Sequence, residues 1–231
     1  MARIIHIGNM KGGVSKTTTT ILLASALSQL PFNLRVCIVD ADEQQSVCNV
    51  RKIDLLAYGI TADKTPFEIF SYSVSELTQR IGKLNSEYDI IFIDAGGKLD
   101  IEQKVSSQQI APILAMSDFL LIPFVSGQIN LAATLTYLDF AKRIEQTRAS
   151  SERKLNILGF VSMCRPRTKQ HAQLMDELKN IESVKIMNAA LNDYAAFRDA
   201  DTVTSFYSTT ITDAAKVNFS NFLNEFFTLI Q

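Results

Sequence analysis

One run of eight residues near the start of the chain combines two glycines, two lysines and two threonines: Lys11, Gly12, Gly13, Val14, Ser15, Lys16, Thr17 and Thr18. The apolar residues Ile4–Gly8 before it predict a buried strand, and the stretch Thr19–Leu27 after it predicts a helix. In this setting the backbone N–H groups of the loop and the positive end of the helix dipole bind phosphate. We therefore predict a phosphate-binding loop.

The loop residues have separate tasks in such a site. Lys16 would reach the β- and γ-phosphates, and the Thr17 hydroxyl would ligate a magnesium ion. The general pattern G-x-x-x-x-G-K-[ST] asks for glycine at two positions where this chain has Met10 and Ser15. If residue 15 has a positive φ angle, serine costs about 1 kcal/mol more than glycine there.

Two further strand-like runs end in aspartate. The run Arg35–Asp40 is followed by Asp42, and Tyr88–Asp94, the third predicted strand, is followed by Gly96 and Gly97. Because ligands bind at the carboxyl ends of parallel strands, these carboxylates are expected beside the phosphate-binding loop. Taken alone, the pair Asp40 and Asp42 has a less favoured interpretation as a helix N-cap plus a solvated carboxylate, and Asp94 is equally well an ordinary strand end.

Apolar strand-like runs alternate with amphipathic stretches along most of the chain. The predicted strands are Ile4–Gly8, Arg35–Asp40, Tyr88–Asp94, Phe119–Phe124 and Leu155–Met163. Helices are predicted at Val74–Leu84, Ile101–Ala115 and Asn130–Ile144. Near-continuous apolar strands alternating with helices favour a doubly wound, mostly parallel α/β sheet with helices on both faces. We expect residues 1–231 to form one domain.

The amino-acid composition further limits the kind of protein that this chain can be. The chain has 231 residues, 47% of them hydrophobic, which is enough for a substantial core, and a net charge of −1 gives no overall attraction to nucleic acid. Three cysteines without a C-x-x-C pair predict reduced thiols. With no predicted signal peptide and no apolar stretch near the roughly 20 residues of a membrane span, we expect a cytoplasmic protein.

The loop at residues 11–18 resembles the deviant Walker A motif K-G-G-x-G-K-[ST] of the ParA/MinD superfamily of P-loop ATPases, and only Ser15 departs from it. The run after the second strand resembles the family's D-x-D-P-Q, with Glu43 in place of proline. The resemblance implies that Asp40 and Asp94, with Thr17, hold magnesium, and that Asp42 orients the attacking water. It also implies that Lys11 reaches the partner's phosphates across a dimer interface, and that Arg165 lies near the nucleotide base.

The three motifs occur in the family's order, so the chain looks like a small ParA-type partition ATPase. Similar proteins bind ATP and Mg²⁺, form a nucleotide-sandwich homodimer and coat nucleoid DNA non-specifically. A ParB-like adaptor stimulates their slow hydrolysis. Because the loop begins so near the first residue, we expect no preceding helix-turn-helix domain.

Two segments bear on the partners. Residues 142–185 hold ten Lys or Arg against five Asp or Glu, densest at Arg165–Lys169, which indicates either a DNA-binding surface or an ordinary solvated one. The amphipathic segment Asp213–Gln231 has a broad apolar face but only Lys216 as a cation, which favours core packing over membrane docking.

Three alternatives remain at this stage. A MinD-like membrane-associated ATPase would need a basic C-terminal helix. An electron-transfer enzyme such as the nitrogenase iron protein would need cluster-ligating cysteines. A nucleotide-dependent scaffold whose hydrolysis is impaired by Ser15 has the same sequence features as a slow ATPase.

Overall fold

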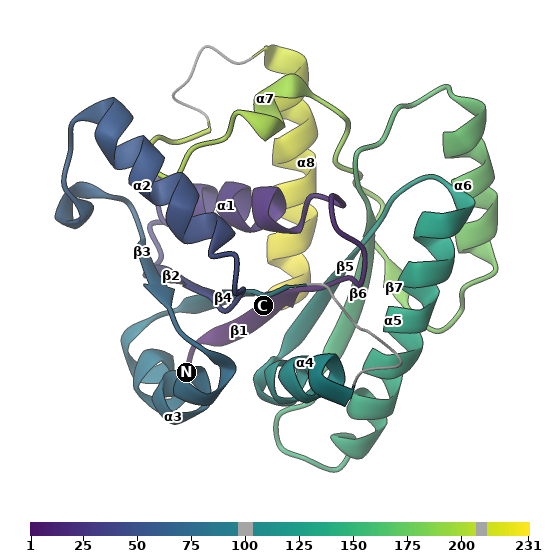
Figure 1. Ribbon diagram of the computed structural model, residues 1–231. Coiled ribbons are helices and arrows are strands. Elements are labelled where there is room, and N and C mark those ends of the chain that lie inside the picture. The colour runs from purple at the N-terminus through teal and green to yellow at the C-terminus, as the bar shows by residue number, and fades with distance from the viewer. Residues whose placement is uncertain (97–103, 207–211) are drawn as a thin grey trace.

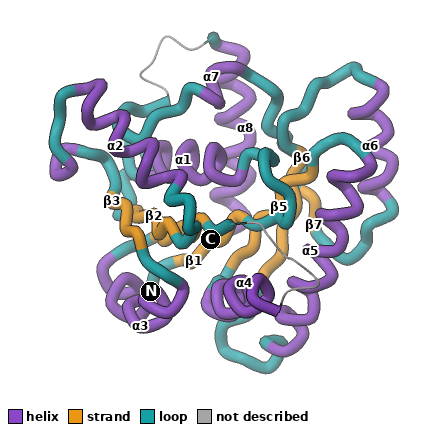
Figure 2. Tube along the Cα trace, viewed as in Figure 1, coloured by secondary structure: helices purple, strands orange, loops and turns teal. Residues whose placement is uncertain are grey.

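The computed structural model describes residues 1–96, 104–206 and 212–231. Its centre is a seven-stranded sheet in the order β3-β2-β4-β1-β5-β6-β7, and every pairing between these described strands is parallel (Figures 1 and 2). The strands are β1 (Arg3–Ile7), β2 (Val36–Asp40), β3 (Glu68–Ser71), β4 (Ile90–Asp94), β5 (Phe119–Phe124), β6 (Asn156–Val161) and β7 (Lys185–Ile186). The predicted α/β class with a parallel sheet is confirmed.

Helices cover both faces of this sheet, with α1 and α8 on one face and α3, α4 and α5 on the other (Figure 1). The helices are α1 (Lys16–Leu27), α2 (Ser46–Tyr58), α3 (Val74–Glu87), α4 (Lys104–Met116), α5 (Gln128–Thr147), α6 (Lys169–Lys179), α7 (Ala195–Arg198) and α8 (Asp213–Ile230), with a 3₁₀ turn η1 at Ala62–Lys64. The first residues of the predicted helix Ile101–Ala115 lie outside the described residues.

The alternation of side chains along each strand explains why the strands are apolar throughout. In β1, Ile5 and Ile7 belong to the core beneath α1 and α8, whereas Ile4 belongs to the core beneath α3. A strand that is covered on both faces buries every residue, so it loses the apolar–polar alternation of a half-exposed strand. The same rule holds in β4, where Phe92 faces α8 and Ile91 faces α3.

Helix α8 packs into the core, as predicted. Its buried aromatic residues contact the sheet directly: the rings of Phe226 and Phe92 have centroids 6.4 Å apart, and those of Phe222 and Phe160 are 5.0 Å apart. Val217 is the exception on the predicted apolar face, because its side chain is 59% exposed. Within the described parts of the chain, no helix is long and apolar enough to cross a membrane.

Three elements were not predicted, because their sequences lack the apolar runs or apolar periodicity used for the others. The edge strand β3 is partly exposed, and β7 has two residues. Helix α2 buries Val47 together with the charged residues Arg51 and Asp54, so its buried face shows no apolar periodicity. Because β3 precedes it, the strand ending in Asp94 is fourth along the chain and not third.

Candidate functional site

The predicted phosphate-binding stretch, residues 11–18, covers the second part of the loop between β1 and α1 and the first residues of α1. Gly13 and Ser15 both have left-handed backbones, with φ angles of 73° and 69°. The condition under which Ser15 costs about 1 kcal/mol relative to glycine is therefore met. Ser15 occupies the N-cap position of α1, but its hydroxyl hydrogen-bonds to the Ser162 and Thr19 hydroxyls and caps no backbone N–H of the first turn. The N–H groups of that turn are thus left for an anion.

Asn9 holds the start of this loop in place by side-chain hydrogen bonds, a role that the sequence analysis did not predict. Its side-chain amide is 1% exposed and donates to the carbonyl of Pro123 at 2.8 Å and to the Thr134 hydroxyl at 2.9 Å. Its Oδ1 accepts from the backbone N–H of Lys11 at 3.1 Å. A polar residue between a buried strand and a glycine loop was the available signal, but Pro123 and Thr134 lie more than a hundred residues away.

Lys16 and Thr17 lie at the first turn of α1. The Lys16 ammonium donates to the carbonyl of Lys11 at 3.0 Å and lines the cavity described below. Burial lowers the pKa of Lys16, and the nearby carboxylates of Asp94 and Asp42 oppose that shift. The Thr17 hydroxyl donates to Asp94 Oδ2 at 2.8 Å.

Asp40 and Asp94 are neighbours across the sheet, because they are paired in the register of β2 and β4. The Asp40 carboxylate accepts from the backbone N–H of Cys48 at 2.9 Å and of Asp42 at 3.3 Å. Burial raises the pKa of Asp94 to about 7, although the bond from Thr17 lowers it. The other Asp94 oxygen, Oδ1, is buried and finds no hydrogen-bond partner among the described residues.

This donor set fits magnesium. A hard cation takes oxygen ligands, and Mg²⁺ is usually held by one or two carboxylates together with phosphates and waters. An unpartnered buried carboxylate oxygen beside a threonine hydroxyl and a second aspartate offers such ligands. In the part of the chain that the structure describes, no three His, Cys, Asp or Glu side chains are grouped to hold a metal by themselves. The site therefore suits an ion that arrives with a phosphate ligand.

Asp42 lies opposite the loop that follows β4. A Cβ atom added at Gly96 would come within 3.2 Å of Asp42 Oδ1. Any residue other than glycine would therefore require the Asp42 carboxylate to move. Asp42 Oδ1 also accepts from the backbone N–H of Gln44 at 3.1 Å. Gly97, the second predicted loop glycine, lies outside the described residues.

A cavity of about 610 Å³ adjoins these groups. Two sets of residues line it, and we call them its two halves. The half predicted from sequence includes Gly12, Gly13, Ser15, Lys16, Thr17, Thr18, Asp42 and Gly96. The other half, which sequence reasoning missed, includes Ser162, Met163, Asn192, Asp193, Tyr194, Phe197 and Arg198. Such a cavity is large enough for a drug-sized ligand, with apolar and aromatic residues on the side away from the phosphate loop.

The remaining predicted site residues, Lys11, Val14 and Arg165, do not line this cavity. Lys11 is exposed, whereas Val14 is 2% exposed and belongs to the core. Arg165 is exposed and pairs with Asp193, donating from Nε at 2.7 Å. Asp193 also pairs with Arg198, and these two arginines hold the pKa of Asp193 below its usual range. Arg165 thus adjoins the cavity through Asp193.

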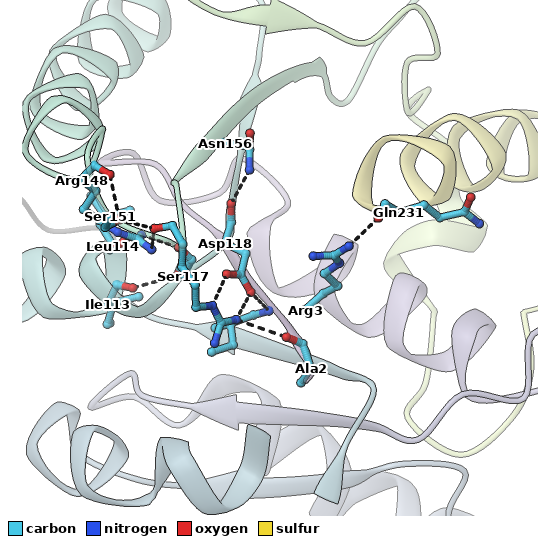
Figure 3. Close-up of polar contacts among 12 residues, drawn as sticks. Ala2, Arg3, Ile113, Leu114, Ser117, Asp118, Arg148, Ser151, Asn156 and Gln231 are labelled. Carbon is cyan, nitrogen blue, oxygen red and sulfur yellow. Dashed lines mark hydrogen bonds and ion pairs between the residues drawn. The ribbon is translucent and has the colours of Figure 1, made fainter. Parts of the chain in front are cut away.

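The basic segment 142–185 is not one surface. Arg148 donates to the carbonyl of Leu114 at 2.8 Å (Figure 3). Arg153 pairs with Asp118, which directly precedes β5 at the amino ends of the strands. Arg167 and Lys169 are exposed, and among the described residues neither takes part in an ion pair. Arg143, Lys154 and Lys185 are also exposed and outside these ion pairs, so the unpaired cations of the segment are spread over several elements, with Arg167 and Lys169 beside each other at the start of α6.

A parallel sheet, a glycine loop that opens into a helix N-terminus, and two aspartates at neighbouring strand ends define the class of P-loop nucleotide-binding proteins. Residues 5–201 match the model of the CobQ/CobB/MinD/ParA nucleotide binding domain. The chain belongs to this family.

Relatives within the family agree with the resemblance seen in the sequence. Plasmid partition protein A of Escherichia coli is 26% identical over 216 residues, which cover 70% of this chain and 52% of the relative. The chain thus spans about half the length of that relative.

Solved structures show the same fold. A plasmid partition protein of Borrelia burgdorferi bound to AMPPNP has a TM-score of 0.69 at 19% identity, covering 98% of both chains. The structure of pNOB8 ParA bound to nonspecific DNA has a TM-score of 0.55 at 20% identity, covering 97% of this chain and 96% of that one.

Proposed function

We propose that this chain is a ParA-type ATPase that segregates DNA or positions another cargo. In this proposal it binds Mg-ATP, forms a nucleotide-sandwich homodimer and binds DNA non-specifically in the ATP state. A ParB-like adaptor stimulates slow hydrolysis to ADP and phosphate, and the protein is cytoplasmic and nucleoid-associated. The observation that carries the proposal is the convergence of Lys16, Thr17, Asp40, Asp42 and Asp94 at one edge of the sheet.

Each of these side chains has a role in phosphoryl transfer to water. Lys16 would donate to β- and γ-phosphate oxygens, while Thr17, Asp40 and Asp94 would hold the magnesium ion. When bound, that ion neutralises charge that develops on the phosphates. Asp42 accepts a hydrogen bond from the attacking water and orients it, so Asp42→Ala is expected to bind ATP but not hydrolyse it. Normal hydrolysis by that variant would contradict the role of Asp42.

The dimer depends on Lys11, whose side chain is exposed beside the loop. In the proposed dimer Lys11 reaches the phosphates bound by the partner. The variant Lys11→Ala should therefore bind nucleotide as a monomer and dimerise poorly with Mg-ATP, as measured by sedimentation velocity. Lys16→Ala is its matched control and should lose nucleotide binding itself.

The surface proposed for DNA is the start of α6, where Arg167 and Lys169 are exposed. The direct test measures binding to non-specific duplex DNA with Mg-AMPPNP and with Mg-ADP across a salt series. Binding that requires the ATP analogue and falls steeply with salt is expected, because phosphate contacts release counterions. The double variant Arg167→Ala, Lys169→Ala should bind more weakly and lower the slope by about two, roughly one per phosphate contact. Lys83→Ala, a change on α3, is the control.

A second candidate is a nucleotide-dependent scaffold that does not hydrolyse ATP. The observation that favours it is the left-handed backbone of Ser15, a serine where the family motif has glycine. Phosphate release measured with DNA and adaptor present separates the two candidates. Complete absence of turnover favours the scaffold, and stimulated turnover favours the ATPase.

A further inference from the structure

The hydroxyls of Ser15 and Ser162 hydrogen-bond to each other at the border of the cavity. Ser15 ends the phosphate-binding loop, whereas Ser162 follows the last residue of β6, 147 positions away. Both residues border the cavity, one in each of its halves. This contact is therefore a direct side-chain link between the phosphate side and the side built by residues 162–163 and 191–198.

Left-handed backbone occurs on both sides of this link. Ser15 has φ 69° and Met163, which directly follows Ser162, has φ 50°. Residues other than glycine hold this conformation only where surrounding contacts determine it. The Ser15 hydroxyl also lies 3.4 Å from the Thr19 hydroxyl, and Thr19 N–H donates to the Ser15 carbonyl at 2.8 Å.

Ser162 depends on the same contact. It is 1% exposed, and its backbone N–H continues the β5–β6 ladder by donating to the Phe124 carbonyl at 2.8 Å. A buried hydroxyl without a partner is costly, so the Ser15 hydroxyl satisfies a group that a glycine at position 15 would leave unpaired. The two serines are thus matched to each other.

We propose that Ser15 and Ser162 form a positioning pair that holds the phosphate-binding loop against the end of β6 and thereby raises nucleotide affinity. The inference rests on the proposed nucleotide binding. The pair touches no reacting atom. It stabilises the left-handed serine of the loop and fixes the spacing between the two halves of the cavity before nucleotide arrives, which reduces the ordering that binding must supply.

A double-mutant cycle on the full-length chain tests the pair. The dissociation constant of Mg-AMPPNP is measured by calorimetry for the wild type, Ser15→Gly, Ser162→Ala and the double variant. With serine at position 15, Ser162→Ala should weaken binding roughly three- to tenfold, the range expected for one lost hydrogen bond. With glycine at position 15, the same change should alter affinity by less than about twofold, because no bond remains to lose.

The controls separate positioning from stability. Ser117→Ala removes another buried hydroxyl, which donates to the Ile113 carbonyl at 2.7 Å near the amino ends of the strands, and should leave the dissociation constant unchanged. Unfolding midpoints of the nucleotide-free variants are recorded in parallel. A lower midpoint for Ser162→Ala with unchanged affinity would overturn the proposal, as would an equal loss of affinity with serine or glycine at position 15. If the wild type itself does not bind Mg-AMPPNP, the proposed function fails instead.

Discussion

Two buried aspartates, one at the carboxyl ends of the strands and one at their amino ends, have very different surroundings. Asp94 ends β4 beside Thr17 and is 2% exposed, whereas Asp118 directly precedes β5 and is 6% exposed. One oxygen of Asp94 accepts from Thr17, and the other has no partner among the described residues. Asp118 accepts from Arg153 through both oxygens and also from the backbone N–H of Ile4 at 2.9 Å.

This difference shows that the burial of an aspartate has to be interpreted together with its hydrogen-bond and charge partners. The Asp118 network joins β1, β5 and the residues before β6, so its charge is neutralised by groups of the chain itself (Figure 3). Asp94 is compensated only in part, by the Thr17 hydroxyl and the nearby Lys16 charge, and burial raises its pKa to about 7. A carboxylate that the fold satisfies stabilises the fold, while one left unsatisfied is available to a cation.

The largest expected effect comes from Asp94→Asn. The variant loses a charged magnesium ligand, so ATP hydrolysis should fall by about a hundredfold or more. Its free energy of unfolding without nucleotide should be unchanged or higher at neutral pH, because a poorly solvated charge is removed. Phosphate release and urea unfolding measure the two quantities. A destabilised protein with wild-type hydrolysis would reverse the comparison with Asp118.

The second effect is the loss of stability in Asp118→Ala. Removal of this carboxylate leaves the Arg153 guanidinium and the Ile4 N–H without their acceptor. Because the Arg153 side chain is 33% exposed, we expect a loss near the lower limit for broken buried pairs, about 3 kcal/mol. Urea unfolding measures it. The folded variant should still bind Mg-AMPPNP as the wild type does, and a selective loss of binding would contradict a purely structural role.

The third effect concerns His6 in β1. Its ring hydrogen-bonds to the Ile93 carbonyl at 2.9 Å and to the Tyr137 hydroxyl at 3.1 Å. Burial lowers its pKa from 6.5 to about 4, against the bond to Ile93, which raises it. Between pH 6.5 and 4 the unfolded chain therefore binds more protons at this residue, so stability falls as the pH falls.

From pH 6.5 to pH 5 the loss at His6 should be about 2 kcal/mol. Asp94 acts in the opposite direction, because a raised carboxyl pKa makes the folded state bind more protons. The difference between the wild type and His6→Gln isolates the histidine, since glutamine can keep hydrogen bonds without titrating in this range. If the free energy of unfolding had the same pH dependence in the two proteins, His6 would not lose its proton on folding.

The sequence was sufficient for the phosphate side of the site because its signals are local. Loop glycines, Lys16 and aspartates at strand ends each lie beside the element that positions them. The opposite half of the cavity consists of residues near 162 and 192–198, which reach the loop only through the packing of β6 and α7. Neither periodicity nor a short motif marks such a contact.

Two further misses have physical causes in single residues. Helix α2 buries Arg51, which donates to the Thr202 hydroxyl at 2.8 Å, and Asp54, which accepts from the Thr202 N–H at 2.8 Å. Charged side chains that hydrogen-bond to Thr202 replace the apolar side chains by which such a helix is normally predicted. Ser15 was recognised as a departure from glycine, but its partner Ser162 became visible only in three dimensions.

The smallest effect is expected for an Arg–Asp pair that, like Arg153 and Asp118, lies at the amino ends of the strands. Arg35 pairs with Asp89 at 2.7 Å, but the two side chains are 63% and 39% exposed. Solvent screens such a pair and side-chain entropy opposes it, so Arg35→Ala should not move the urea midpoint beyond repeat error. The bond from the Arg35 N–H to Asp89 at 2.9 Å survives the change. A loss comparable to that of Asp118→Ala would mean that burial of the carboxylate does not distinguish the two pairs.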